Sequence, residues 1–332
     1  MKVIYPKYYY DFSCIAADCP DSCCQEWDVD VDADSAKFYY SLPGDLGNSL
    51  RRVLRDSDDG AIMTIQDGRC PMWRKDGLCR IHAELGHEAL CKTCREFPRL
   101  RHDYGNFVEW GLELSCPEAA RLILTYPGTL ESTEIPGGEE PDYDPETMRI
   151  LQQSRSAVLD YLDEDGLPVP LKLAVILVYA HHVQNWLDGG EEAAIDEASA
   201  LNLLAQQTSV GDWESIIDFF LHLEILTERW RLRLETPAPE SAWHGGYTAL
   251  MRYFVLRYWL QAVADFDLIG RVKFMIVSCL LLYRLGGDFV ETAQLFSKEI
   301  ENDADNMNAL WDAAYTDIAL TDMNLLRLLK NG

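Results

Sequence analysis

The chain has 332 residues with the composition of a folded globular protein, since 48% are hydrophobic and 25% are charged. Its 55 acidic and 29 basic residues give a formal net charge of -26. Nucleic-acid phosphates and anionic lipid headgroups repel a chain this acidic, so we expect neither nucleic acid nor a membrane as a partner. The longest apolar runs also fall well short of the roughly 20 residues that span a bilayer.

The opening residues indicate where the protein works. Residues 1–10 contain no apolar stretch of the kind that an export signal carries. We therefore expect the protein to be cytoplasmic. Because that compartment keeps thiols reduced, clustered cysteines there bind metal more often than they form disulfides.

Residues 1–125 are rich in cysteine and in turn signals, and we predict that they form a metal- or cluster-binding domain of short helices and loops. Nine of the ten cysteines of the chain lie in the first 116 residues. Thiolates are soft ligands for zinc and for iron–sulfur clusters, and four ligands complete either kind of site. The candidate metal ligands are Cys14, Cys19, Cys23, Cys24, Cys70, Cys79, Cys91, Cys94 and Cys116.

The spacing of these cysteines leaves the number of sites open. Nine thiols suffice for one site with spares or for two sites with one thiol left over. The neighbours Cys23 and Cys24 do not readily reach the same zinc ion, so either they serve different sites or one of them is structural. The closest spacings favour Cys19, Cys23, Cys91 and Cys94 as one set of four ligands.

Basic residues gather around the second half of the cysteine pattern. Residues 69–101 hold eight basic and four acidic side chains, although the whole chain is acidic. Nearby cations and N–H donors stabilise the negative charge of a four-thiolate site, so this excess favours a cluster. The abundance of cysteine favours iron–sulfur over zinc. His82 and His87 are the best placed of the few histidines, whereas His102 is expected to be solvated.

Residues 126–146 separate the two parts of the chain. Tyr126, Pro127 and Gly128 end the preceding segment, and residues 131–146 then contain seven acids, three prolines and two glycines. This composition predicts an acidic linker or a surface loop.

Residues 147–332 are predicted to form an all-α domain, which makes the whole protein mainly α. Apolar residues recur there at three- and four-residue spacing. Asp212 is placed to cap the start of one helix, and Cys279 is expected to be a buried small hydrophobe inside another. The predicted helices are 148–162, 170–187, 212–234, 247–264, 268–285, 289–301 and 307–329.

Two strings in the cysteine region are distinctive: the double cysteine at 23–24 followed by Trp27, and the run Thr-Cys-Arg-x-Phe-Pro-Arg at 93–99. With them, the first 117 residues resemble the flagellin lysine-N-methylase family, whose cysteine motif is shared by a wider group of proteins described as zinc- or iron-chelating. Further matching positions are Pro6, Tyr8, Phe12, Cys14, Cys19, Cys70-Pro71, Gly77-Leu78-Cys79, Ile81, Leu85-Gly86, Leu90-Cys91 and Cys116-Pro117.

The resemblance implies an activity. It implies methyl transfer from S-adenosylmethionine to lysine side chains of a protein substrate such as flagellin, in a protein that carries an iron–sulfur cluster of the 4Fe-4S type, with zinc as the alternative. The helical remainder resembles the family only in pattern, as in Tyr253-Phe254-x2-Arg257-Tyr258.

Lysine methylation requires a deprotonated amine, aligned with the methyl sulfonium, and an apolar channel for the lysine stem. Because aromatic rings attract both cations, Tyr8, Tyr10, Trp27 and Tyr253 are weak candidates for catalytic residues. The sequence contains no glycine-rich loop in a strand–helix context, so donor binding is implied by the resemblance alone. The alternative function is a non-catalytic zinc- or iron-binding redox or interaction module.

Overall fold

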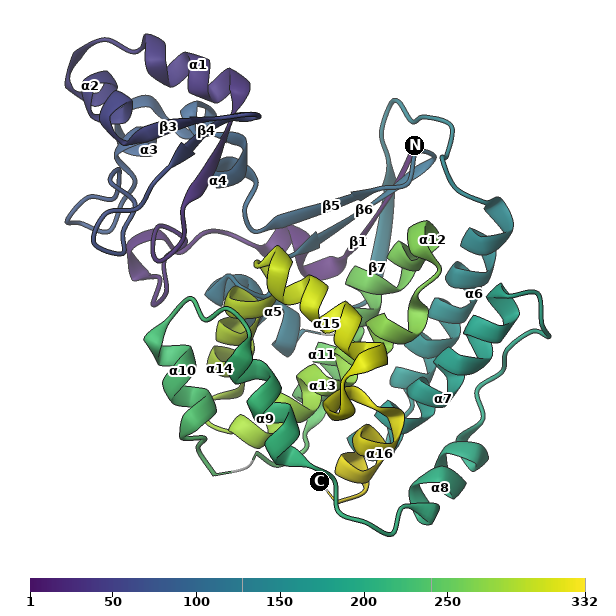
Figure 1. The fold of residues 1–332 in the computed structure, drawn as a ribbon. Helices are drawn as coiled ribbons and strands as arrows, with labels where there is room; N and C mark the ends of the chain where they lie inside the picture. Colours follow the sequence, from purple (N-terminus) through teal and green to yellow (C-terminus); the bar gives the residue numbers. More distant parts are fainter. Residues whose placement is uncertain (127, 240, 332) are drawn as a thin grey trace.

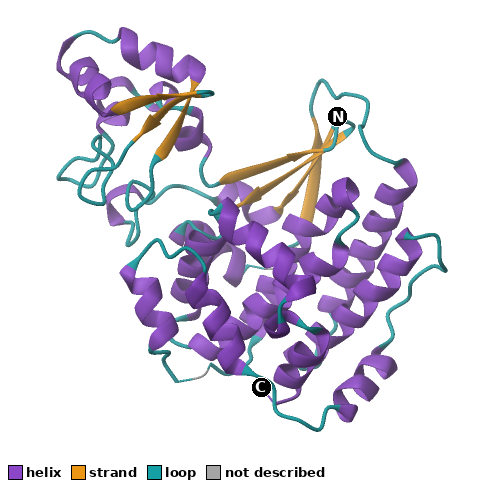
Figure 2. Ribbon diagram, viewed as in Figure 1, coloured by secondary structure: helices purple, strands orange, loops and turns teal. Residues whose placement is uncertain are grey.

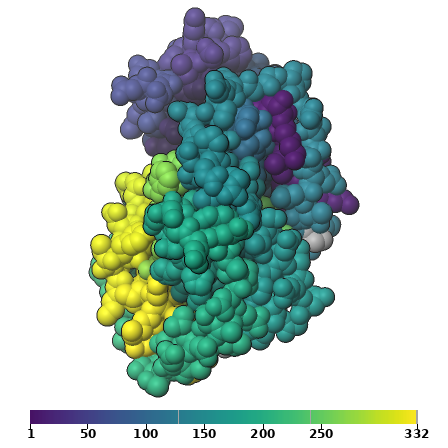
Figure 3. Space-filling model, turned by 90° about the vertical axis from the view of Figure 1, so that its right-hand side faces the viewer, coloured from purple at the N-terminus to yellow at the C-terminus, as the bar shows by residue number. Residues whose placement is uncertain are grey.

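The computed structural model describes residues 1–126, 128–239 and 241–331. The fold is mainly helical, as the sequence predicts, and its apolar residues form two separate cores (Figures 1 and 2). We call residues 29–96, which surround the smaller core, the lobe, residues 13–28 the cysteine loop, and the remainder of the described chain the body. In the space-filling view the lobe stands at one end of the molecule and the yellow C-terminal helices cover one side (Figure 3).

A four-stranded sheet with the strand order β5-β6-β1-β7 lies across the body. Strand β1 (Lys2–Pro6) runs parallel to β6 (Phe107–Leu112) and antiparallel to β7 (Leu130–Glu134). Strand β5 (Arg99–Asp103) pairs antiparallel with the other edge of β6. The sheet therefore joins the N-terminus to segments more than 100 residues away in the sequence.

The helices of the body pack around α13, whose side chains are buried nearly all round. A helix that is apolar on every face belongs at the centre of a bundle. Cys279 of α13 is fully buried, as predicted. The helices are α5 (Pro117–Thr125), α6 (Pro145–Leu162), α7 (Val169–Leu187), α8 (Glu197–Gln206), α9 (Trp213–His222), α10 (Glu228–Glu235), α11 (Gly245–Tyr258), α12 (Ala262–Asp265), α13 (Leu268–Leu285), α14 (Phe289–Phe296), α15 (Ala304–Thr316) and α16 (Asp322–Asn331).

Several helices are shorter than the sequence predicts. Asp212 caps α9 by accepting a hydrogen bond from the Ser215 amide at 3.0 Å, as predicted, but the helix ends at His222 instead of continuing to residue 234. The predicted helix is interrupted there because the Leu226 amide donates its hydrogen bond to the Glu299 carboxylate, at 2.8 Å. The predicted helices 247–264 and 307–329 are also interrupted, and α8 was not predicted at all.

The lobe contains strands, where short helices and loops were predicted. Its sheet has the order β2-β4-β3, and both pairings are antiparallel. Helices α1 and α2 pack beside this sheet, and α3 and α4 carry cysteines at their starts. The lobe elements are β2 (Val29–Asp32), α1 (Ala33–Ser41), α2 (Gly44–Val53), β3 (Leu54–Ser57), β4 (Gly60–Met63), α3 (Arg80–Leu85) and α4 (Lys92–Glu96).

The predicted domain boundary at residue 125 stays a prediction, but the packing of apolar side chains draws a different line. Val3, Leu112 and Leu122 share one core with the helices that follow residue 147. Residues 130–134 of the predicted linker form strand β7, with all five side chains exposed, and Pro127 lies outside the described residues. Within the described chain, no helix is long and apolar enough to cross a membrane.

Candidate functional site

A cavity of about 360 Å³ opens where the lobe meets the body, and we call it the thiol cavity. Its walls come from the loop that follows β1, from the lobe, from the start of α5 and from Lys298. Seven of the nine predicted ligands line it: Cys14, Cys19, Cys23, Cys24, Cys79, Cys94 and Cys116.

The remaining two predicted ligands, Cys70 and Cys91, lie buried directly beside the cavity. The Cys70 thiol donates to the Met63 sulfur at 3.5 Å, and the Cys70 backbone amide donates to the Cys24 carbonyl at 2.8 Å. Cys94 lies three residues after Cys91, and its thiol lowers the pKa of Cys91. All nine cysteines are free thiols. Within the described residues, no group of three Cys, His, Asp or Glu side chains is arranged to hold a metal ion.

Three of these cysteines stand immediately before a helix. Cys79 precedes α3, Cys91 precedes α4 and Cys116 precedes α5, where Pro117 occupies the first helical position. None of the three side chains accepts a capping hydrogen bond, but the nearby backbone amides of the first turn act to lower the pKa of each thiol. The amide groups at a helix start favour negative charge, so this placement suits thiolates.

Glycine lets two cysteine-bearing segments approach each other closely. Gly77 lies two residues before Cys79 and has a φ of +79°, which side-chain-bearing residues rarely adopt. A Cβ at this position would lie 3.3 Å from the Cα of Ala17, in the loop that carries Cys14 and Cys19. The glycine of the sequence motif therefore helps to bring the lobe against that loop.

The close spacing of the thiols shifts their pKa values. The neighbouring thiols of Cys23 and Cys70 lower the pKa of Cys24. Burial raises the pKa of Cys116 to about 11, against the opposing effect of the amides at the start of α5. A metal ion would displace the remaining thiol protons, so its binding would release protons and depend on pH.

The neighbours Cys23 and Cys24 have different surroundings. The Cys24 backbone carbonyl accepts the Cys70 amide at 2.8 Å, from the lobe side. The interaction with the Cys24 thiol and burial raise the pKa of Cys23 most. The charges of Cys24, Cys14 and Cys116 raise it further. The pair thus stands between thiols of the lobe and thiols of the loop and body.

Only part of the predicted basic excess reaches the thiol cavity. Arg95 and Arg99 line it, and the Arg99 guanidinium lies 5.1 Å from the centre of the Phe12 ring. His82 and His87 also line it, with their rings 5.9 Å apart. Other members of the basic group form surface ion pairs, such as Arg74–Asp76, Arg80–Glu84 and Arg101–Asp103.

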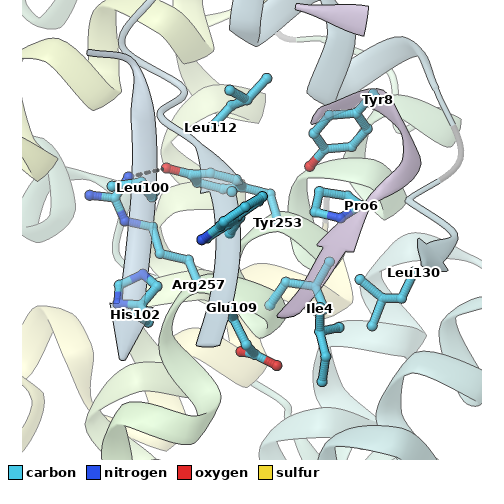
Figure 4. A pocket seen from close by; sticks show the side chains of 13 residues that line it. Ile4, Pro6, Tyr8, Leu100, His102, Glu109, Leu112, Leu130, Tyr253 and Arg257 are labelled. Atoms are coloured by element: carbon cyan, nitrogen blue, oxygen red, sulfur yellow. Dashed lines mark hydrogen bonds between the residues drawn. The ribbon is translucent and has the colours of Figure 1, made fainter. Parts of the chain in front are cut away.

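A second, smaller cavity of about 40 Å³ lies between the body sheet and α11, and we call it the sheet cavity (Figure 4). Arg257 donates a hydrogen bond to the Tyr253 hydroxyl at 2.6 Å. The hydroxyls of Tyr253 and Tyr258 donate in turn to the buried Glu301 carboxylate, at 3.0 and 2.6 Å. This network was not predicted, because Glu301 approaches α11 only in the folded chain.

Comparison with known proteins bears directly on the family resemblance. The chain is 31% identical over 168 residues to the flagellar biosynthetic protein FliU of Salmonella muenchen, a match that covers 47% of this chain and 95% of that protein. The chain belongs to the flagellin lysine-N-methylase family.

The matches to two further members of the family cover a smaller share of those proteins. The chain is 33% identical over 144 residues to the lysine-N-methylases of Salmonella choleraesuis and Salmonella typhimurium. Each match covers 40% of this chain and 35% of the relative, so the chain matches only about a third of their length. No family model matches the chain, and no solved structure matches it.

The four candidate catalytic residues do not meet at one place. Tyr8 and Tyr253 line the sheet cavity, Trp27 lines the thiol cavity, and Tyr10 is 62% exposed. His102 was predicted to be solvated, but its Nε2 atom is buried beside the sheet cavity without a hydrogen-bond partner. Burial, with a smaller effect of Arg257, lowers the pKa of His102.

Proposed function

We propose that this member of the family is a protein-lysine N-methyltransferase that uses S-adenosylmethionine, acts on a flagellin-type protein and holds an iron–sulfur cluster in the thiol cavity. One observation carries the proposal: seven of the nine cysteines of the sequence pattern line one cavity, in a chain whose relatives are named lysine-N-methylases.

The arrangement of the thiols supports a cluster more than a single zinc ion. Four-coordinate zinc takes ligands about 2.3 Å from one point, whereas a polynuclear cluster takes thiolates spread around it. The thiols line a cavity, and backbone amides near Cys79 and Cys116 act to lower their pKa, as amides near cluster ligands do. We propose the nine predicted ligands as the source of its four thiolates. When bound, such a cluster supplies one-electron chemistry or anchors the segments that ligate it.

The thiol cavity also suits a small molecule. Its volume of about 360 Å³ falls within the range of small-molecule sites. Phe12, Trp27 and Phe97 give it aromatic walls, which attract a sulfonium or an ammonium. In the proposed reaction the lysine ammonium first loses a proton to solvent. The amine nitrogen then bonds to the methyl carbon while the bond from that carbon to the sulfonium sulfur breaks, and S-adenosylhomocysteine leaves as a thioether.

The experiment that tests this proposal separates metal binding from methyl transfer. The full chain is purified without oxygen, and its iron, sulfide and zinc are quantified. It is then incubated with flagellin and S-adenosylmethionine carrying an isotopically labelled methyl group, and lysines are read by mass spectrometry, with the donor omitted as the control. We expect iron with sulfide and labelled methyl-lysine. Bound metal without saturable donor binding or label would favour the non-catalytic module.

A further inference from the structure

Asp21 joins the cysteine loop to the body, and we call its contacts the Asp21 junction. It lies two residues after Cys19, and its side chain is only 10% exposed. Three donors from the body reach its carboxylate: Lys298 Nζ at 2.7 Å, Gln294 Nε2 at 2.9 Å and Arg229 Nη2 at 3.2 Å.

Lys298 holds a second point on the same segment. Its Nζ donates to Glu26 Oε2 at 2.6 Å and lies 5.2 Å from the centre of the Trp27 ring. Glu26 has a φ of +75°, a conformation that a residue other than glycine adopts only when its surroundings hold it there. One ammonium therefore ties both ends of residues 21–26, the segment that contains Cys23 and Cys24.

The donors stand on a well-anchored element of the body. Gln294 lies in α14, and Lys298 follows four residues later in the π-helix Ser297–Glu301, so both face the same way. Residues 292–301 are all buried, and π-turns of this kind recur at functional sites. The same π-helix also carries Glu301 of the network beside the sheet cavity.

Another buried lysine shows what an ordinary structural role looks like. Lys273 is buried, and its Nζ donates a hydrogen bond to the Ala314 carbonyl at 2.7 Å and pairs with Asp322 at 2.8 Å. Both partners belong to the body. The partners of Lys298 belong to the cysteine loop, and Lys298 itself lines the thiol cavity.

We propose that Lys298 is a positioning residue that holds the Cys19–Cys24 loop against the body, so that Cys19 and Cys23 face Cys116 across the thiol cavity. Without this ammonium, the carboxylates of Asp21 and Glu26 lose their shared partner, and the contacts of Asp21 with Gln294 and Arg229 hold the loop less firmly. The consequence for metal binding rests on the proposed function, whereas the position of the loop does not.

The test compares Lys298→Met with Lys273→Met in the full chain. Both variants remove a buried, ion-paired ammonium and keep a linear side chain. The rates at which Cys19 and Cys23 react with iodoacetamide are measured by peptide mass spectrometry, beside the iron, sulfide and zinc content. We expect Lys298→Met to raise both alkylation rates at least about fivefold and to lower any bound metal, while Lys273→Met leaves both at the parent values. Equal results in the two variants overturn the proposal.

Two further variants keep the outcome decisive. If Lys298→Met does not fold, Asp21→Asn replaces it, since it keeps the side-chain shape and removes the charge that Lys298 and Arg229 share. Lys298→Arg retains the charge, so we expect Cys19 and Cys23 to be alkylated more slowly in this variant than in Lys298→Met. If the parent binds no metal, the proposed cluster is wrong, but the alkylation rates still decide whether Lys298 holds the loop.

Discussion

At the scale of single residues, Cys94 connects the predicted ligand pattern with the observed cavity. It lines the thiol cavity, and its thiol lowers the pKa of the buried Cys91. Cys279 offers a matched control, since it is fully buried in α13 and is not among the residues that line this cavity. The two positions therefore separate the role of a ligand from that of a packed side chain.

We predict that Cys94→Ser loses at least half of the bound metal and melts several degrees lower, because a hydroxyl is a poor substitute for a soft thiolate and metal binding stabilises the fold. Cys279→Ala should lose about 1 kcal/mol of unfolding free energy through its small cavity and keep its metal. Metal analysis and thermal melting measure both effects. A Cys94→Ser protein with the parent's metal content and melting temperature would exclude Cys94 from the site.

Asp322 gives a prediction on pH. Burial acts to raise its pKa, but hydrogen bonds from His181 and Lys273 outweigh burial and lower the pKa to about 2. Because the folded pKa lies below the ordinary value of 3.8, the stabilisation is present above about pH 4 and is lost as the pH falls towards 2. The side chain is 38% exposed, so solvent screening limits the contribution to about 1 kcal/mol.

Urea unfolding of Asp322→Asn and the parent at a series of pH values measures this contribution. The parent should be more stable at pH 7, and the difference should shrink as the pH is lowered from 5 to 3. A difference that stays constant over that range would show that the carboxylate charge does not stabilise the fold.

At the scale of elements, the acidic segment before α6 does more than separate two regions. Asp144 accepts the Thr147 amide at 2.7 Å and so caps the start of α6, which packs in the core of the body. Asp142, two residues earlier, is exposed and belongs to no helix. One acidic residue of the predicted loop is therefore structural, and its neighbour serves as a control.

We predict that Asp144→Ala lowers the free energy of unfolding by about 1 kcal/mol, because the helix loses its N-cap. Asp142→Ala should change it by less than about 0.5 kcal/mol, as exposed substitutions usually do. Denaturant titration of the parent and the two variants measures these changes in the free energy of unfolding. Equal stability of the two variants would mean that the cap contributes nothing measurable.

At the scale of the whole molecule, the thiol cavity belongs to neither the lobe nor the body alone. Cys79 and Cys94 come from the lobe, Cys116 from the start of α5 in the body, and the loop around Cys19 lies between them (Figure 1). The apolar core of the body includes residues from both sides of the predicted boundary at 125. The N-terminal part of the chain thus depends on the helices that follow it.

We predict that a fragment of residues 1–125 does not fold on its own. It would expose the apolar faces of α5 and the body sheet, which the helices after residue 147 cover in the full chain. Size-exclusion chromatography should find aggregates, and circular dichroism should find no cooperative thermal transition. A monomeric fragment with a cooperative transition would restore the boundary at residue 125.

The sequence by itself determined the features that arise from local pattern. Long apolar periodicity predicted α6, α7 and α13 to within three residues, because helical hydrogen bonds connect residues four apart. The motif around the cysteines identified the family, and the nine metal ligands stay a prediction.

Only the tertiary structure decided the features that depend on contacts between distant segments. The four-residue strands of the lobe carry too short a pattern to identify, and Glu299 ends a predicted helix from 73 positions away. Lys298 lies within a predicted helix, yet its ammonium reaches Asp21 across 277 positions. A charged side chain in a helix is ordinarily solvated, and burial among distant carboxylates gives it another role. That burial is a property of the packed molecule, which no local pattern encodes.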